Sequence, residues 1–231
     1  MAGARSTLRE YLEALLVAVI FAVFVRTFVF QAFTIPSESM AGNLLVGDHI
    51  LVNKFVYGPT AGRWERRLLP VRGIERGDVV VFRYPENPQR DFIKRCLGLP
   101  GEEVEIVDKV LHVDGERIEE GGYVRFVDDR VYPDSRFLDE HWRRRDHFGP
   151  YRVPPDGYFC LGDNRDNSRD SRYWRQPAVP RHYVKGRALL VYWSFGGPPR
   201  VAGEGPLARL VYVARHFAEL TRWERTFRLV R

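Results

Sequence analysis

The sequence predicts a mostly β domain that follows one N-terminal membrane helix and precedes a C-terminal amphipathic helix. Residues 14–25 (ALLVAVIFAVFV) are an unbroken apolar run, and apolar character resumes after Arg26 to reach Phe33. Beyond this point short apolar runs alternate with turns, and the chain's 15 Pro and 20 Gly favour strands over a helix bundle. An apolar fraction of 45% excludes wholesale disorder.

Residues 14–33 number 20, enough for a helix of about 30 Å that crosses a bilayer. Arg5 and Arg9 before this segment place the N-terminus in the cytoplasm, so residues 1–32 are predicted to be a cytoplasmic end and an uncleaved anchor. A removed secretory signal is the rival, but Arg26 and bulky residues stand where a small-x-small cleavage site would follow. A buried helix of a soluble protein is the third alternative.

Residues 33–199 are expected to form an extracytoplasmic catalytic domain, with a hairpin-rich insertion within 103–150 that becomes polar after residue 119. Asp114-Gly115 predicts a hairpin turn, because both residues tolerate positive φ. The clearest strand runs are 49–57, 78–84, 91–99, 103–118 and 188–195.

Residues 196–199 (GGPP) are predicted to be a linker to a basic extension, 200–231, which holds seven Arg and three Glu. Its apolar residues recur at helical spacing, so the predicted helix either packs on protein or lies on a membrane. These residues are Leu207, Leu210, Val211, Ala214, Phe217 and Leu220.

The formal net charge of +6 lies largely in this extension, where a nucleic-acid-binding tail is a weak alternative to a docking helix or a membrane-surface helix. Cys96 and Cys160 are not in a CxxC pair, and the six His lack metal-ligand spacing. An oxidising compartment permits a disulfide between the two cysteines, although free buried thiols are the favoured alternative. We expect no metal and no organic cofactor.

Three segments could carry chemistry. Pro36 forces an extended approach to the turn Ser37-Glu38-Ser39, although a lone Ser in such a turn is usually structural. Strand alternation places Lys94 on the same face as Phe92 and Cys96, where a buried amine would have a lowered pKa and could deprotonate a Ser hydroxyl. The alternative is a lysine that reaches water at the strand edge.

The third segment, residues 157–174, contains GDNRDNSRDSRYW from Gly162 to Trp174. Its Asp, Asn and Ser side chains would hydrogen-bond their own backbone, which makes a rigid loop able to aim one hydroxyl, such as that of Ser168, at a buried amine. A solvated loop is the ordinary reading of such alternating charges, and a calcium loop is disfavoured because the EF-hand Gly and Glu are missing.

Together these segments resemble bacterial type I signal peptidase, a Ser/Lys protease family with a mostly β fold. The resemblance covers most of residues 33–195 in the family's order. The matching strings are IPSESM (35–40), GDHILVNKF (47–55), GDVVVF (77–82), FIKRCLGLPGE (92–102), GDNRDNSRDSRYW (162–174) and, more loosely, VKGRALLVYWSF (184–195).

The resemblance implies that Ser39 is the nucleophile and Lys94 its general base, with Ser37 and the Ser39 N–H as the oxyanion hole. Ser168 would orient the Lys94 amine, and the pairs Asp170–Arg172 and Arg95–Asp163 would brace the loop. The residues that match pocket-lining positions are Phe33, Ile35, Met40, Leu44, Ile50 and Ile93.

The implied protein is a membrane-bound serine endopeptidase of the bacterial inner membrane. It has a single pass with its N-terminus inside, and it acts as a monomer that removes signal peptides after Ala-x-Ala-like sites on the periplasmic side. Its partners would be preproteins and the lipid bilayer, and not nucleic acid.

The sequence departs from the family pattern at two places. These are Glu38, where the family has Gly or a small polar residue, and Ala41-Gly42-Asn43, where the family has Pro. We expect Glu38 to face water. A Ser/Lys peptidase with one dedicated substrate and a non-catalytic peptide-binding module are the alternatives.

Overall fold

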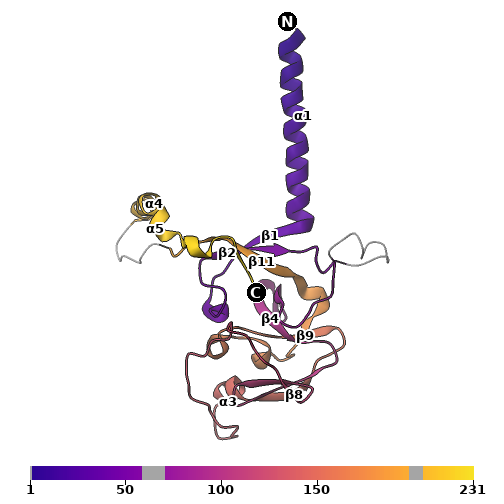
Figure 1. Cartoon of the computed structure of the whole chain (residues 1–231), viewed down its shortest axis with the longest axis vertical. Helices are drawn as coiled ribbons and strands as arrows, with labels where there is room; N and C mark the ends of the chain where they lie inside the picture. The colour runs from indigo at the N-terminus through magenta and orange to yellow at the C-terminus, as the bar shows by residue number, and fades with distance from the viewer. Residues whose placement is uncertain (1, 59–70, 198–204) are drawn as a thin grey trace.

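A long N-terminal helix stands away from a β domain (Figure 1). The computed structural model describes residues 2–58, 71–197 and 205–231. Helix α1 (Ala2–Phe24) continues through one π-helical turn, η1 (Val25–Val29), directly into strand β1 (Phe30–Thr34). Residues Thr7–Val29 have a mean hydropathy of 2.3 and are long and apolar enough to cross a membrane. No part of its most apolar stretch is buried within the described part of the chain, so most of its apolar side chains are exposed.

The larger sheet is antiparallel, and its strands follow the order β1-β2-β11-β3-β4-β9-β10, with β12 also paired to β11. This architecture confirms the mostly β prediction. The predicted runs at 49–57, 78–84, 91–99 and 188–195 lie on four of these strands. The bounds are β2 Asp48–Asn53, β3 Val79–Tyr84, β4 Asn87–Gly98, β9 Gly157–Leu161, β10 Val179–Pro180, β11 Val184–Ser194 and β12 Arg228–Leu229.

A smaller sheet of order β7-β6-β5-β8 comes from the predicted insertion. Its strands are β5 Glu103–Val107, β6 Val110–Val113, β7 Glu116–Arg117 and β8 Phe148–Arg152, with helix α3 Glu140–Asp146 before β8. Asp114 and Gly115 have φ values of 49° and 81°, which confirms the predicted turn. A second tight turn at Asp108-Lys109, with φ values of 50° and 67°, splits the run that was predicted at 103–118.

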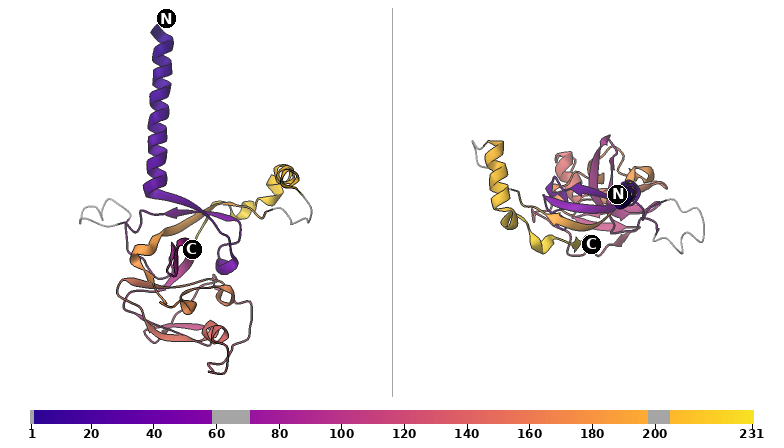
Figure 2. Two further views of the ribbon diagram at one scale, coloured as in Figure 1. Left: turned by 180° about the vertical axis from the view of Figure 1, so that it is seen from behind. Right: turned by 90° about the horizontal axis from the view of Figure 1, so that it is seen from above.

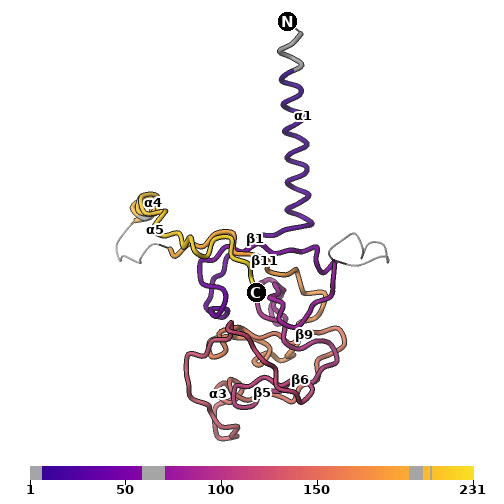
Figure 3. Tube along the Cα trace, viewed as in Figure 1, coloured from indigo at the N-terminus to yellow at the C-terminus, as the bar shows by residue number. Residues whose placement is uncertain are grey.

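Buried apolar side chains from both sheets form a core where the sheets meet. Leu97 of β4 and Phe159 and Leu161 of β9 pack with the buried side chains of β5 and β6. Gly98 allows this approach, because a Cβ there would lie 2.6 Å from Val104 Cγ2 and 2.9 Å from Phe159 Cβ. The trace in Figure 3 shows the smaller sheet below the larger one, on the side away from α1.

The C-terminal segment leaves the domain and returns to it. Helices α4 (Pro206–Arg215) and α5 (Phe217–Leu220) project to one side (Figure 2), and β12 then brings Val230 into the core. The predicted C-terminal helix is present as two helices separated at His216. Of the predicted linker, Pro198 and Pro199 lie outside the described residues.

One buried ion pair holds the returning segment. The Arg225 guanidinium contacts both carboxylate oxygens of Asp48, and Ser194 Oγ donates to Asp48 Oδ1 at 2.6 Å. Burial raises the pKa of Asp48, but the bonds from Arg225 and Ser194 outweigh it, so the net pKa is lowered.

We predict that Arg225→Met lowers the free energy of unfolding by about 3–5 kcal/mol. The change removes the guanidinium that contacts both oxygens of the buried Asp48 carboxylate, and it leaves only Arg222, whose Nη2 is 3.6 Å from Asp48 Oδ1. Arg228→Met is the matched control, since Arg228 is exposed on β12. Thermal unfolding of the detergent-solubilised variants measures both. Equal midpoints for the two variants would contradict the assigned role of Arg225.

Candidate active site

Ser39 lies in the loop that joins β1 to β2. Backbone bonds from Ile35 N to Asp48 O (2.8 Å) and from Gly47 N to Ile35 O (3.0 Å) close this loop at its base. Within it, Glu38–Met40 form the 3-10 helix η2, which turns the Ser39 side chain inward. Ser37 and Glu38 are exposed, so Glu38 faces water, and Ser37 Oγ lies 3.5 Å from Ser39 Oγ.

Lys94 on β4 reaches the Ser39 hydroxyl from 55 residues away in the chain. Its Nζ is 2.6 Å from Ser39 Oγ and donates to Ile93 O at 3.0 Å. Lys94 is 4% exposed, and burial lowers its pKa to about 8 against the opposing charges of Asp170 and Asp163. The reading in which this lysine reaches water at the strand edge is therefore wrong.

Both faces of β4 are buried here, not only the face that carries Lys94. Arg95 points to the other face and is 1% exposed. Cys96 pairs in register with Cys160 of β9, and both thiols are buried and free. Burial raises the pKa of the Cys160 thiol well above its ordinary value.

The loop from Gly162 to Arg172 bonds directly to the Ser39 turn. Asn164 N donates to Ser39 O at 3.1 Å, and Asn164 Nδ2 donates to Glu38 O at 3.2 Å. A Cβ on Gly162 would lie 2.2 Å from Ser168 Oγ and 2.5 Å from Ser39 O, so only glycine lets these groups approach each other. Within the described part of the chain, the buried Ser168 Oγ has no hydrogen-bond partner.

Asp170 and Arg172 form a buried fork in this loop. Arg172 Nε and Nη2 each donate to an Asp170 oxygen at 2.9 Å, while Gly162 N donates to Asp170 Oδ2 at 3.1 Å. Burial raises the pKa of Asp170, but the Arg172 charge and these bonds outweigh it and lower the net pKa. Asp170 thus stays anionic and ties Gly162 to the loop.

Arg95 and Asp163 form a second buried pair, with Nε–Oδ1 and Nη2–Oδ2 distances of 2.7 and 2.6 Å. The Arg95 guanidinium also stacks 3.7 Å from the centre of the Tyr123 ring and donates to Gly77 O. Tyr123 lies close to the Ser39 loop as well, because a Cβ on Gly42 would meet Tyr123 O at 1.6 Å. The departure from the family at Ala41-Gly42-Asn43 therefore accommodates the Tyr123 backbone.

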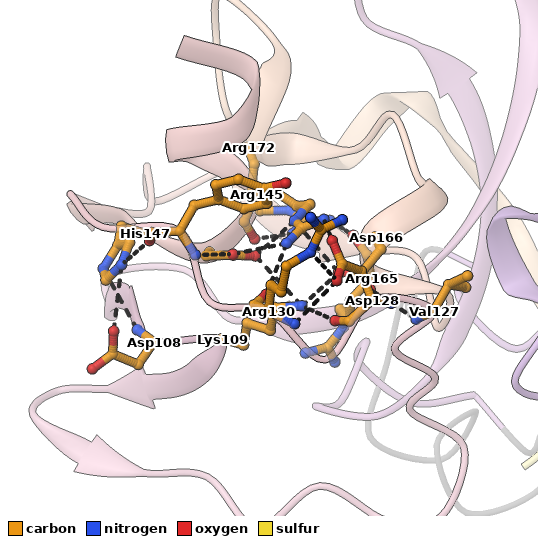
Figure 4. Close-up of polar contacts among 12 residues, drawn as sticks. Asp108, Lys109, Val127, Asp128, Arg130, Arg145, His147, Arg165, Asp166 and Arg172 are labelled. Atoms are coloured by element: carbon orange, nitrogen blue, oxygen red, sulfur yellow. Dashed lines mark hydrogen bonds and ion pairs between the residues drawn. The ribbon is translucent and has the colours of Figure 1, made fainter. Parts of the chain in front are cut away.

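A cluster of charges that the sequence analysis did not assign supports the same loop (Figure 4). Arg145 of α3 pairs with Asp146 at 2.8 Å and Asp128 at 3.1 Å, and Lys109 pairs with Asp166 at 3.1 Å. Arg172 Nη1 donates to Arg145 O at 2.7 Å, which joins the cluster to the Asp170 fork. In the sequence these residues resemble a solvated charged stretch, and only their burial distinguishes them.

The six predicted pocket residues gather in one apolar cluster beside Ser39. Ile35, Met40, Leu44 and Ile50 are buried within this cluster. Phe33 and Ile93 pack against the cluster and are partly exposed.

Comparison with known proteins identifies the family. The model of the family described as signal peptidase, peptidase S26, matches residues 8–193. The chain belongs to this family. The S26 chain is 37% identical to signal peptidase I of Pseudomonas aeruginosa, with 82% of this chain and 74% of that protein covered. It is 32% identical to signal peptidase I of Aquifex aeolicus, with 81% and 85% covered.

The solved structure of a signal peptidase I from Enterococcus faecalis is 30% identical in sequence, with a TM-score of 0.37. The match covers 50% of the present chain and 97% of the Enterococcus chain. Family membership makes the protein a serine endopeptidase, as the sequence predicted. The apolar helix and the relatives together indicate a membrane-anchored protein.

We predict that Lys94→Met stabilises the S26 protein. A drop in pKa from 10.5 to about 8 corresponds to a cost of about 3 kcal/mol when the folded protein must carry the proton. Between these two values the unfolded state binds more protons, so wild-type stability rises with pH across that window. The gain in Lys94→Met is therefore full below pH 8 and disappears above about pH 10.5.

Unfolding midpoints measured from pH 6 to 10.5 test this difference. Lys185→Met is the control, because Lys185 is partly exposed and paired with Asp91 at 2.7 Å. A Lys94→Met protein less stable than wild type at pH 6–7, or a gain independent of pH, would contradict a desolvated amine.

Proposed function

We propose that this protein removes N-terminal signal peptides from exported preproteins by a Ser39/Lys94 dyad, after small-x-small sites of the Ala-x-Ala type. The observation that carries the proposal is the 2.6 Å separation of Lys94 Nζ and Ser39 Oγ, both of which belong to buried side chains. A neutral amine at that distance can accept the hydroxyl proton directly.

The reaction divides into two proton-balanced halves. Ser39 Oγ attacks the scissile carbonyl carbon while its proton passes to Lys94 Nζ, which gives a tetrahedral oxyanion. Collapse breaks the C–N bond, and the leaving amine takes the proton from Lys94, so an ester on Ser39 remains. Water then attacks this ester with Lys94 again as base, and the signal peptide leaves with a free carboxylate.

Ser37 and Ser168 have supporting roles in the proposal. The Ser37 hydroxyl, next to Ser39, and the Ser39 backbone N–H would stabilise the oxyanion. The Ser168 hydroxyl is buried beside Ser39 O and has no partner among the described residues, so it is free to bond to the Lys94 amine. The Asp170–Arg172 and Arg95–Asp163 pairs would hold the loop that carries Ser168.

Two strand edges can receive an extended peptide. β1 is the end strand of its sheet, and β9 pairs with β4 only from Arg95 onward. In the described part of the chain the edge of residues 87–94 away from β3 is therefore unpaired, close to Lys94. Strand addition here would place the substrate's small side chains on Phe33 and Ile93.

The position of Ser39 suits a substrate that emerges from a bilayer. The candidate span ends at Val29, and Ser39 follows ten residues later (39 − 29 = 10). Arg5 and Arg9 favour a cytoplasmic N-terminus, which places residues 33–199 on the extracytoplasmic side of the bacterial inner membrane. The enzyme would act as a monomer without a cofactor.

We predict an acidic limb near pH 8 in kcat/KM for a preprotein with an Ala-x-Ala site, because Lys94 must be neutral to act. Activity should fall about tenfold per pH unit below that limb. Ser39→Ala and Lys94→Ala should abolish cleavage, while Lys54→Ala, a lysine remote from the dyad, keeps it. Near-full activity in Lys94→Ala, or a limb near the pKa of a free lysine, would overturn the dyad.

A panel of unrelated preproteins tests the substrate class. We expect detergent-solubilised enzyme to cleave several of them and to fail when either small residue of the site becomes Phe, since the proposal places small substrate side chains directly on Phe33 and Ile93. Cleavage of one preprotein only would favour a dedicated peptidase. If none is cleaved and a serine-directed acylating agent leaves Ser39 unlabelled, a peptide-binding module replaces the enzyme.

A further inference from the structure

The apolar face of α4 is exposed. Leu207 and Leu210 are 73% and 64% exposed, and Val211 and Phe217 are also open to solvent. At 100° per residue Leu207, Leu210, Val211 and Ala214 share one side of the helix. A helix with such a stripe normally turns it toward a protein core, but here the described residues leave it uncovered.

The orientation of α4 differs from that of the anchor. In Figure 1 α1 is seen along its length and α4 end-on, whereas the view from above in Figure 2 shows α1 end-on and α4 along its length. The two helix axes are therefore roughly perpendicular. Both side views place α4 at the height where α1 meets β1. If α1 crosses a bilayer, α4 lies in the plane of its surface.

Specific contacts fix the base of this arm to the large sheet. The Phe217 and Trp193 rings stack with their centroids 5.7 Å apart, and Trp193 Nε1 donates to Thr221 Oγ1 at 3.3 Å. Arg222 donates to Val46 O at 2.7 Å. These bonds hold the arm beside the domain, so its height relative to α1 is a property of the fold.

The charge of the segment identifies the surface it fits. Residues 206–231 contain six Arg and two Glu, and of these arginines Arg222 and Arg225 both pair with Asp48. Residues 206–220, which hold α4 and α5, contain two Arg and one Glu. An exposed apolar stripe with an excess of arginine is typical of helices that lie at the boundary of anionic headgroups and acyl chains.

We propose that α4 and α5 form a second membrane contact, which lies flat on an anionic lipid surface with Leu207 and Leu210 in the acyl region. The contact goes beyond the proposed function, because it needs no substrate. It also lies outside residues 8–193, the part that the family model matches. With α1 it would hold the domain at two points and thereby restrict rotation about the anchor.

Site-directed fluorescence on the full chain tests the contact. The variants Leu210→Cys and, as the matched control, Arg215→Cys are labelled with an environment-sensitive nitrobenzoxadiazole dye; Arg215 is exposed about 140° further round the same helix. Cys96 and Cys160 are fully buried, and wild-type protein measures any background labelling. The proteins are reconstituted in vesicles of phosphatidylethanolamine and phosphatidylglycerol.

We expect spin-labelled lipids to quench the dye at position 210 severalfold more than at 215, with slower reduction by aqueous dithionite at 210. The difference should shrink in pure phosphatidylcholine vesicles.

Equal quenching at both positions would overturn the membrane contact. Protection from dithionite without lipid quenching would also overturn it, in favour of a second copy of the chain. Equal quenching at 210 in the two vesicle types would overturn the requirement for anionic lipid. None of these readouts depends on peptide cleavage, so the membrane contact is tested independently of the proposed function.

Discussion

Burial lowers the pKa of the Lys94 amine to about 8, and this burial is the constraint on which the rest of the site depends. Its Nζ lies between the Ser39 turn, β4 and the Gly162–Arg172 loop, and each of these would leave the amine hydrated if it moved away. The three segments come from distant parts of the chain and must be held together without a cation at the centre. Burial of this amine costs stability, and under the proposed function it supplies the base.

The interactions that offset the cost of burying Lys94 are ion pairs around its amine. Arg172 and Arg95 are themselves buried, and each meets a carboxylate in a two-pronged contact that also bonds to the backbone. Because Asp170 and Asp163 are paired with these arginines, the site contains anions near Lys94 without an excess of negative charge that would hold its proton. The cluster around Arg145 extends this support to the smaller sheet.

The same fold sets the site against the candidate membrane. Since α1 continues through η1 into β1, and β1 leads directly into the Ser39 loop, Ser39 cannot move far from the end of the candidate span. β1 is the end strand of its sheet, and in the described part of the chain residues 87–94 of β4 are unpaired on the side away from β3. A second contact through α4 would fix the tilt of the domain, which a single helix leaves free.

The sequence by itself determined the elements that depend on local physics. Apolar length gave the anchor, alternation gave most strands of the large sheet, and Asp114-Gly115 gave its turn, because each follows from neighbouring residues. The strings around Ser39, Lys94 and Ser168 also identified the family. Only the tertiary structure decided that Lys94 is buried, that both faces of β4 are buried, and that Arg145 and Arg225 are ion-paired inside the protein. Burial depends on which distant segments of the chain pack together. The residue type alone therefore does not distinguish an arginine in solvent from one paired with a buried carboxylate.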